Sequence, residues 1–104
     1  MQPISLVVPV PSAGTPVQLT TDKSIACVSL LIKALASNAG STVYVGRASN
    51  FNATSGTDLI VDINGVDQSF LVQASDSTNR IIPSQYWVDA ATSGDKLLVT
   101  YWVG

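Results

Sequence analysis

The side chains of this chain that could take part in chemistry are seven aspartates, one cysteine, and the hydroxyl and amide groups of its polar residues. The sequence contains no histidine and no glutamate, which are the side chains most used for proton transfer near neutral pH and are prominent metal ligands. The spacing of the aspartates singles out no pair suited to glycoside hydrolysis. Catalysis would have to rest on Asp, Ser or Tyr alone, so we expect no enzyme, no catalytic residues and no cofactor.

The segment from Asp62 to Asp67 superficially resembles the start of a calcium-binding loop. An EF-hand loop would need an oxygen ligand at its fifth position and a bidentate acid at its twelfth, and these positions hold Val66 and Gln73. The pair Asn64-Gly65 is the one preferred by two-residue β-hairpins. We therefore predict a hairpin at this point and no metal site.

Cys27 is the only cysteine of the chain, which excludes an internal disulfide. A nucleophilic thiol needs a partner that favours its thiolate form, and the chain has no histidine to supply one. The neighbours of Cys27 are apolar, so we predict a buried and inert thiol.

Composition points to a surface that meets a partner. Only 12% of the residues are charged, about half the fraction in an ordinary soluble domain, whereas 46% are hydrophobic. Serine, threonine, asparagine and glutamine supply most of the polarity, and they favour flat, partner-covered surfaces. The net charge is −2 without a cluster of basic residues, which disfavours binding to nucleic acid through its phosphates. These properties are typical of a structural or assembly protein.

The chain has no feature typical of membrane proteins or secreted proteins. No apolar run approaches the roughly 20 residues that a membrane-spanning helix needs. The start, Met1-Gln2-Pro3-Ile4, lacks the charged and apolar regions of a signal peptide. We expect no membrane partner, and synthesis in the cytoplasm.

Short apolar-rich runs alternate with clusters of Gly, Asn, Ser and Pro, and within the runs the apolar residues recur every second position. This period of two predicts β-strands, at a spacing typical of a sandwich or barrel. Residues 25–36 are long enough for a helix, but β signals flank them and no clear cap is present, so a strand is favoured. We predict one all-β domain over residues 1–104, an antiparallel β-sandwich or jelly-roll-like fold of about eight short strands. The predicted strands cover residues 4–10, 17–20, 26–35, 42–47, 59–63, 69–73, 86–88 and 97–103.

The N-terminal segment, residues 1–11, holds three prolines, Pro3, Pro9 and Pro11. Proline removes a ladder donor, so this segment cannot be a central strand. It is either an edge strand protected from aggregation or an arm that lies on a neighbouring subunit. The longest predicted loop is 48–57, around Phe51. We predict partner contacts in these two segments, at Ile4, Leu6, Val8, Asn50, Phe51 and Asn52.

Five aromatic residues leave a further interpretation open. They could form a platform on which sugars stack, as in a carbohydrate-binding module, although aromatics in strands more often belong to a core or an interface. In the last predicted strand, Trp102 lies on the face opposite the alternate residues that begin with Leu97. We therefore expect some aromatic surface to be exposed in the monomer. The five residues are Tyr44, Tyr86, Trp87, Tyr101 and Trp102.

Turn and strand signatures spread over most of the chain resemble those of small virion proteins of tailed bacteriophages. The segments that carry the resemblance are Gly14–Thr20, the apolar strand around Cys27, Ser37–Gly46, Tyr86–Ala90, Ser93–Lys96 and Val99–Trp102. The resemblance implies a compact β-sandwich or jelly roll that attaches to a phage head or tail. Decoration, or cement, proteins of this kind often form trimers over capsid lattice positions.

On this basis we expect a structural virion protein that decorates and stabilises a phage capsid by binding the assembled shell. Its partners would be the major capsid protein or other virion proteins, and it would form a homo-oligomer, most simply a trimer. A tail, baseplate or head-completion component is the first alternative, and copy number per particle separates it from a decoration protein. A small carbohydrate-binding module is the second alternative.

Overall fold

In the residues that the computed structural model describes, eight β-strands and one short 3-10 helix are joined by turns and loops. The described residues are 2–35, 38–40, 42–54, 56, 58–65, 68–75 and 80–103. The elements are β1 (Gln2–Pro9), β2 (Val17–Gln18), β3 (Ser29–Ala34), β4 (Thr42–Gly46), β5 (Leu59–Asn64), β6 (Ser69–Gln73), η1 (Pro83–Gln85), β7 (Trp87–Ala90) and β8 (Lys96–Val103). Within these residues there is no helix with the length and apolar character that a membrane span requires.

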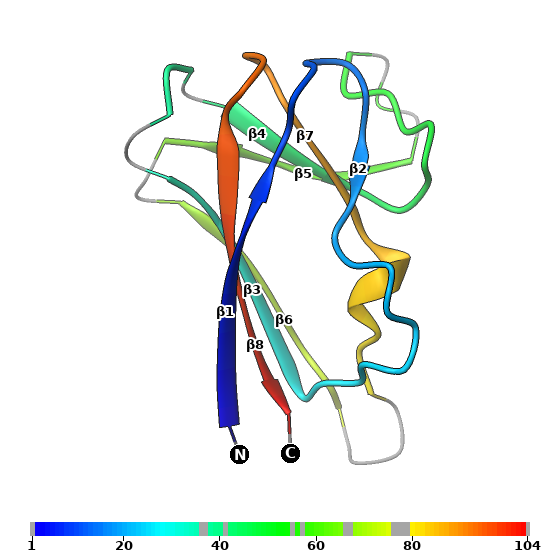
Figure 1. The fold of residues 1–104 in the computed structure, drawn as a ribbon. Helices are drawn as coiled ribbons and strands as arrows, with labels where there is room; N and C mark the ends of the chain where they lie inside the picture. Colours follow the sequence, from blue (N-terminus) through cyan, green and yellow to red (C-terminus); the bar gives the residue numbers. More distant parts are fainter. Residues whose placement is uncertain are drawn as a thin grey trace.

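The strands form two antiparallel sheets that pack against each other (Figure 1). Sheet A has the strand order β1-β8-β3-β6, and sheet B has the order β2-β7-β4-β5. The first strand pairs with the last, β2 with β7, β3 with β6, and β4 with β5. This nested pairing is that of one long hairpin rolled into two layers, the jelly-roll arrangement. The predicted all-β antiparallel sandwich is confirmed.

The core lies between the sheets because the strands alternate apolar residues on their inner sides. In β3, Leu30 and Ile32 are fully buried, and in β8 so are Leu97 and Val99. Sheet B contributes Val43, Val45, Ile63 and Val88 to the same cluster. Complete burial of one such side chain stabilises a fold by about 1.5–3 kcal/mol, so this interior is the main source of stability.

The N-terminal segment is the edge strand β1, which pairs along its whole length with β8. Val10, just after β1, donates to Asp95 O and accepts from Gly94 N, so the backbone groups of alternate residues face β8. Pro3 and Pro9 belong to the other set of alternate residues, whose backbone groups point away from β8 toward the free edge of the sheet. The missing N–H of each proline is therefore at the free edge and not in the pairing with β8. The prolines leave the ladder intact and remove donors that another strand would use. Figure 1 shows the two chain ends side by side, as the pairing of Gln2 with Val103 requires.

The predicted hairpin at Asn64-Gly65 is wrong. Strand β5, which ends at Asn64, belongs to sheet B, whereas β6 pairs with β3 in sheet A. The chain crosses between the layers here because Ile63 is buried from one sheet, and Phe70 and Val72 pack on the core from the other. Gly65 does adopt a positive φ of 81°, so the local turn preference is present without the pairing.

The third strand is shorter than the predicted 26–35, and its alternation reverses at Cys27. The backbone of Cys27 exchanges two hydrogen bonds with Ile81 outside the named strands, at 2.8 and 2.9 Å. In a regular strand, Cys27 and Leu30 would point to opposite faces, because they are three positions apart. Both side chains are buried in the core, so the regular alternation is broken between the bridge at Cys27 and β3. Pro83 ends regular pairing as predicted, because η1 begins there.

Candidate functional site

The outer face of sheet A is rich in apolar side chains. Because Leu30 and Leu97 point inward, their sequence neighbours on β3 and β8 point outward. We call the outward residues of the four strands of sheet A the apolar face. They are Pro3, Ser5, Val7 and Pro9 from β1; Lys96, Leu98, Thr100 and Trp102 from β8; Ser29, Leu31 and Lys33 from β3; and Ser69, Leu71 and Gln73 from β6.

Strand register brings the apolar members of this face together. Leu31 lies between Thr100 and Leu71, and Trp102 lies between Pro3 and Ser29. Leu31, Leu71 and Trp102 line an open depression of about 290 Å³ with Ser29 and Gln73. Apolar side chains from three adjacent strands therefore form one continuous surface.

Exposure and charge distinguish this face from the rest of the molecule. Leu71 is 53% exposed and Val7 is 48% exposed. These are the highest exposed fractions among the large hydrophobic side chains in the described part of the chain. The only charged groups on the face are Lys33 and Lys96, and none of its members is acidic. An apolar centre with basic residues toward its margin fits a protein surface that is apolar and carries acidic groups at its rim.

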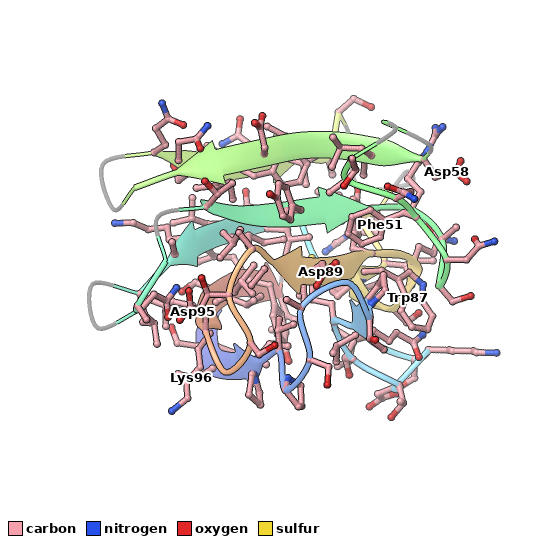
Figure 2. The ribbon with its side chains drawn as sticks, turned by 90° about the horizontal axis from the view of Figure 1, so that it is seen from above. Phe51, Asp58, Trp87, Asp89, Asp95 and Lys96 are labelled. Atoms are coloured by element: carbon pink, nitrogen blue, oxygen red, sulfur yellow. The ribbon has the colours of Figure 1, made fainter. Side chains whose placement is uncertain are left out.

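Sheet B has a different outer face, because two loops cover it. Phe51, from the loop after β4, is 3% exposed, and its ring packs directly on Gly46, where any side chain would overlap it. The base of this loop is closed by a backbone hydrogen bond of 3.1 Å from Arg47 N to Asp58 O. Figure 2 shows Phe51 beside β4, with Trp87 and Asp58 at one side of the view and Asp95 and Lys96 at the other. The loop is thus anchored to the sheet by an aromatic side chain.

The second loop, residues 11–16, is held by Asp89 of β7. Asp89 is 4% exposed, and its Oδ1 accepts hydrogen bonds from Gly14 N at 3.1 Å and Ala90 N at 2.8 Å. Gly14 has a φ of 88°, a conformation that favours glycine. Ser93 Oγ adds a hydrogen bond of 2.9 Å from Ala13 N. The loop therefore has a defined position over the sheet.

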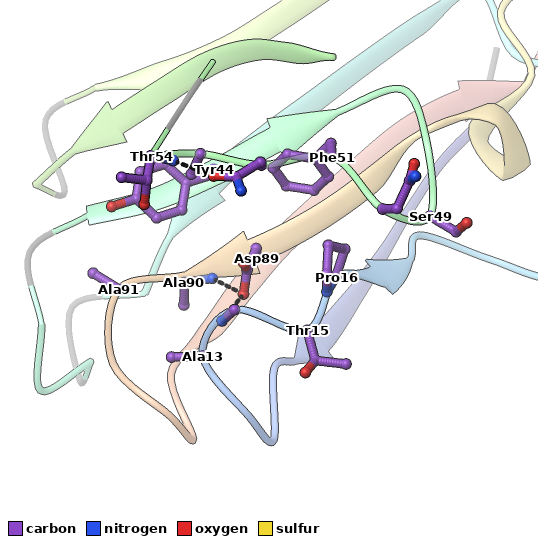
Figure 3. A pocket seen from close by; sticks show the side chains of 14 residues that line it. Ala13, Thr15, Pro16, Tyr44, Ser49, Phe51, Thr54, Asp89, Ala90 and Ala91 are labelled. Carbon is purple, nitrogen blue, oxygen red and sulfur yellow. Dashed lines mark hydrogen bonds between the residues drawn. The ribbon is translucent and has the colours of Figure 1, made fainter. Parts of the chain in front are cut away.

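Between the two loops lies a cavity of about 710 Å³, which we call the loop cavity (Figure 3). Its floor carries Tyr44 of β4 and Asp89 of β7, which are directly paired across the two strands. The walls are residues 13–16 and 49–54, and Ala90 and Ala91 complete the lining. Asp89 is the only charged side chain among the lining residues.

A second buried carboxylate, Asp95, has a purely structural arrangement. Its Oδ1 accepts from Ala39 N at 2.8 Å and its Oδ2 accepts from Gly40 N at 2.9 Å, so both oxygens hold the same turn. Asn38 reinforces that turn, because its amide donates to Lys96 O and accepts from Lys96 N, both at 2.8 Å. Asp95 and Asp89 are equally buried, but no hydrogen bond among the described residues occupies Asp89 Oδ2.

The six predicted partner contacts are not alike in the structure. Val8 and Phe51 are buried, and Leu6 packs against the core, so these side chains stabilise the monomer. Ile4 is 37% exposed at the end of the same inward-facing row. Asn50 and Asn52 are exposed on the wall of the loop cavity. Contact of these residues with a partner stays a prediction.

Cys27 is buried, as predicted, and its Sγ donates a weak hydrogen bond of 3.5 Å to Ile81 O. Burial raises the pKa of the Cys27 thiol above its ordinary value, and the positive charge of Arg80 opposes the shift only in part. A thiol held in its protonated form is a poor nucleophile, which agrees with an inert core residue.

The five aromatics do not form one sugar platform. Tyr101 is buried, Trp102 lies on the apolar face, and Tyr44 lies in the loop cavity. Tyr86 and Trp87 line a different open depression of about 400 Å³, and the Tyr86 ring is tilted against Phe70 at 6.2 Å. The alternative of one shared platform therefore does not hold for these five residues, because the fold carries them to the core and to three different surfaces.

The sequence segment that resembles a calcium-binding loop runs from Asp62 to Asp67. Asp62 is exposed on β5, and Asp67 lies outside the described residues. Among the residues that are described, no three His, Cys, Asp or Glu side chains are close enough to hold a metal ion.

The apolar face was not predicted as a site, although the sequence contains a signal for it. Consecutive apolar residues, such as Leu30-Leu31-Ile32 and Leu97-Leu98-Val99, indicate strands that are apolar on both sides. No comparable signal marks the loop cavity, because its floor and walls come from segments that are distant in the sequence.

The chain was also compared with known proteins. No protein-family model, no curated protein sequence and no solved structure matches it.

Proposed function

We propose that this protein is a structural virion protein that decorates and stabilises a phage capsid by binding the assembled shell through the apolar face. The observation that supports the proposal most strongly is the continuous, uncovered surface formed by Leu31, Leu71 and Trp102. Large exposed apolar patches of this kind mark sites of protein–protein interaction. The resemblance to small phage virion proteins supplies the setting.

The mechanism is one of mass action. A protein that binds only the assembled shell lowers the free energy of the shell relative to its separated subunits, in proportion to occupancy. Trp102 is the expected anchor, because tryptophan is enriched among the few residues that contribute most of the binding energy of an interface, and Leu71 adds exposed apolar area beside it. Lys33 and Lys96 would pair with acidic residues of the shell and set the orientation.

The proposed partners are the major capsid protein or other virion proteins, and the proposed assembly is a homotrimer. Three weak contacts act together when their carrier is trimeric, because the second and third contacts form at a high effective concentration. The exposed edge of β1 borders the apolar face and carries few free donors, so we assign contacts between copies to side chains and not to strand addition.

The test is co-sedimentation of the purified protein with capsid shells that lack it. We expect wild type to sediment with the shells and Leu71→Lys to lose at least tenfold in affinity, because a charge would be buried at the interface. Ile60→Lys is the matched control: Ile60 is 36% exposed on β5 of the other sheet, and its replacement should leave binding unchanged. Equal binding of all three proteins would refute the role of the apolar face.

Quantitative mass spectrometry of purified virions tests the setting. A decoration protein is present in hundreds of copies per particle and a tail, baseplate or head-completion component in far fewer, as the resemblance implies. Virions without this chain would remove the proposal altogether.

A further inference from the structure

The loop cavity lies on sheet B, across the sandwich from the apolar face, and the proposed capsid contact does not use it. Its volume of about 710 Å³ is within the range of about 300–1,000 Å³ that is typical of small-molecule sites. Any ligand of this cavity is therefore independent of shell binding, and each function can be tested without the other.

Both cavity walls are anchored to sheet B. Phe51 anchors one wall on Gly46, and Asp89 Oδ1 anchors the other through Gly14 N. Within the first wall, Asn52 Oδ1 accepts a hydrogen bond of 2.8 Å from Thr54 N. A preformed cavity binds a ligand without the cost of ordering its own loops.

The lining retains unused hydrogen-bonding capacity. Asp89 is 4% exposed, and its Oδ2 has no partner among the described residues. In that part of the chain, every fully buried side-chain polar atom does have a partner, so Oδ2 is not fully buried, and Asp89 is one of the residues that line the cavity. The lining also includes Thr15, Tyr44 and Asn50, whose side chains take part in no hydrogen bond among the described residues.

We propose that the loop cavity binds a neutral mono- or disaccharide. A pyranose presents hydroxyl groups that both donate and accept, together with an apolar face of C–H groups. A sugar hydroxyl would donate to Asp89 Oδ2, the Asn50 amide would bond adjacent hydroxyls, and the C–H face would lie on the Tyr44 ring.

Charge selects this class over other small ligands. The lining contains no lysine, arginine or histidine, and the buried carboxylate of Asp89 would repel phosphate or carboxylate groups. Tyr44 and Phe51 are the only aromatic residues of the lining, and Phe51 is buried against Gly46. Only the Tyr44 ring is then left to face a ligand, and an aromatic cage around a cation needs more than one ring.

The test is an NMR titration of the full chain with glucose, N-acetylglucosamine, maltose and cellobiose, followed by amide chemical shifts. We expect at least one of these sugars to shift the amides of Gly14, Asn50 and Ala90. No shifts with any of them up to about 10 mM, or shifts confined to the surroundings of Trp87, would overturn the proposal. This measurement uses the wild-type protein, so it does not depend on the folding of any variant.

Three variants sharpen the result. Asp89→Asn keeps an oxygen to accept from Gly14 N but replaces the free carboxylate oxygen, and it should weaken sugar binding at least tenfold, as should Tyr44→Ala. Asp62→Asn is the matched control, an exposed aspartate paired with Tyr44 from the opposite side, and should bind normally. Loss of binding in Trp87→Ala but not in Asp89→Asn would place the sugar elsewhere. Tighter binding of the anionic N-acetylneuraminic acid than of every neutral sugar would refute the ligand class.

Discussion

The two outer faces of this sandwich are built from the same strand alternation and yet differ in almost every property. Sheet A has the two longest strands, β1 and β8, and no described loop folds back over its outward residues. Sheet B has shorter strands, and the loops at 11–16 and 47–54 fold back over it. One face is therefore uncovered and rich in apolar side chains, and the other is covered by loops and hollowed between them. Loop placement, more than strand pattern, decides which kind of partner each face can meet.

The two faces also differ in what they contribute to the fold. On sheet B, Phe51 and Asp89 hold the loops in place, so the surface is part of the folded structure. On sheet A, Leu71 and Val7 are about half exposed and pack little of their area in the monomer. The substitutions below test whether these side chains contribute less to the stability of the monomer than the anchors of sheet B do.

The largest expected effect is on the sheet B side. Phe51→Ala should lower the free energy of unfolding by about 3–5 kcal/mol, because a buried ring is removed from its contact with Gly46. Urea denaturation followed by tryptophan fluorescence measures this loss. The exposed neighbour Asn50→Ala is the control and should change stability by less than about 0.5 kcal/mol. A small loss of unfolding free energy in Phe51→Ala would mean that the loop is not anchored as described.

The two buried aspartates give a smaller and more selective effect. Asp95→Asn should cost about 1.5–3 kcal/mol, because one of its two accepting oxygens becomes an N–H₂ group that faces a backbone donor. Asp89→Asn should cost less than about 1 kcal/mol, because Oδ1 still accepts and only the free oxygen changes. Thermal and urea unfolding of both variants gives the comparison. Equal losses would show that Asp89 Oδ2 is already engaged within the protein.

The interior that both faces share has a pH dependence set by Cys27. Burial raises the pKa of its thiol, whose ordinary value is 9.0, so the unfolded chain loses this proton at a lower pH than the folded chain does. The unfolded state is then favoured, and stability falls as the pH rises above about 9 and through the folded pKa. Urea unfolding measured from about pH 8, below the ordinary pKa, up to about pH 11 should show a smaller decline in Cys27→Ala than in wild type. Identical declines would contradict a buried, protonated thiol.

The smallest expected effect is on the stability of the apolar face. Leu71→Ser should change the free energy of unfolding by less than about 0.5 kcal/mol, because the side chain is already 53% exposed. Urea denaturation provides the value. A loss near that of Phe51→Ala would mean that the face belongs to the monomer core and would remove the contrast between the two sheets.

Much of the fold could be predicted from the sequence, because alternation within one strand is a local property. The bounds of β6 were predicted to the residue, and Leu97, Val99 and Tyr101 were placed correctly on one face. The Asn64-Gly65 hairpin was wrong because the choice of partner strand depends on which sheet buries Ile63, which local turn preference does not determine. The burial of Phe51 and Val8 in the monomer could not be predicted, because an apolar residue in a loop or at an edge gives no sign of packing on its own sheet.

The candidate surfaces were harder to predict than the fold. Tyr44 and Asp89 are 45 positions apart in the sequence and become neighbours only through the pairing of β4 with β7. The sequence places Asp95 in a turn and Asp89 in or near a strand, but it does not show which backbone donors the fold brings to each carboxylate.

Cryo-electron microscopy of the proposed phage particle tests the central claim most directly. We expect the outer face of sheet A, with Leu31, Leu71 and Trp102, to lie on the capsid surface, and the loop cavity on sheet B to open away from the shell. A particle in which sheet A faces solvent and sheet B contacts the capsid would contradict the division of roles between the two faces.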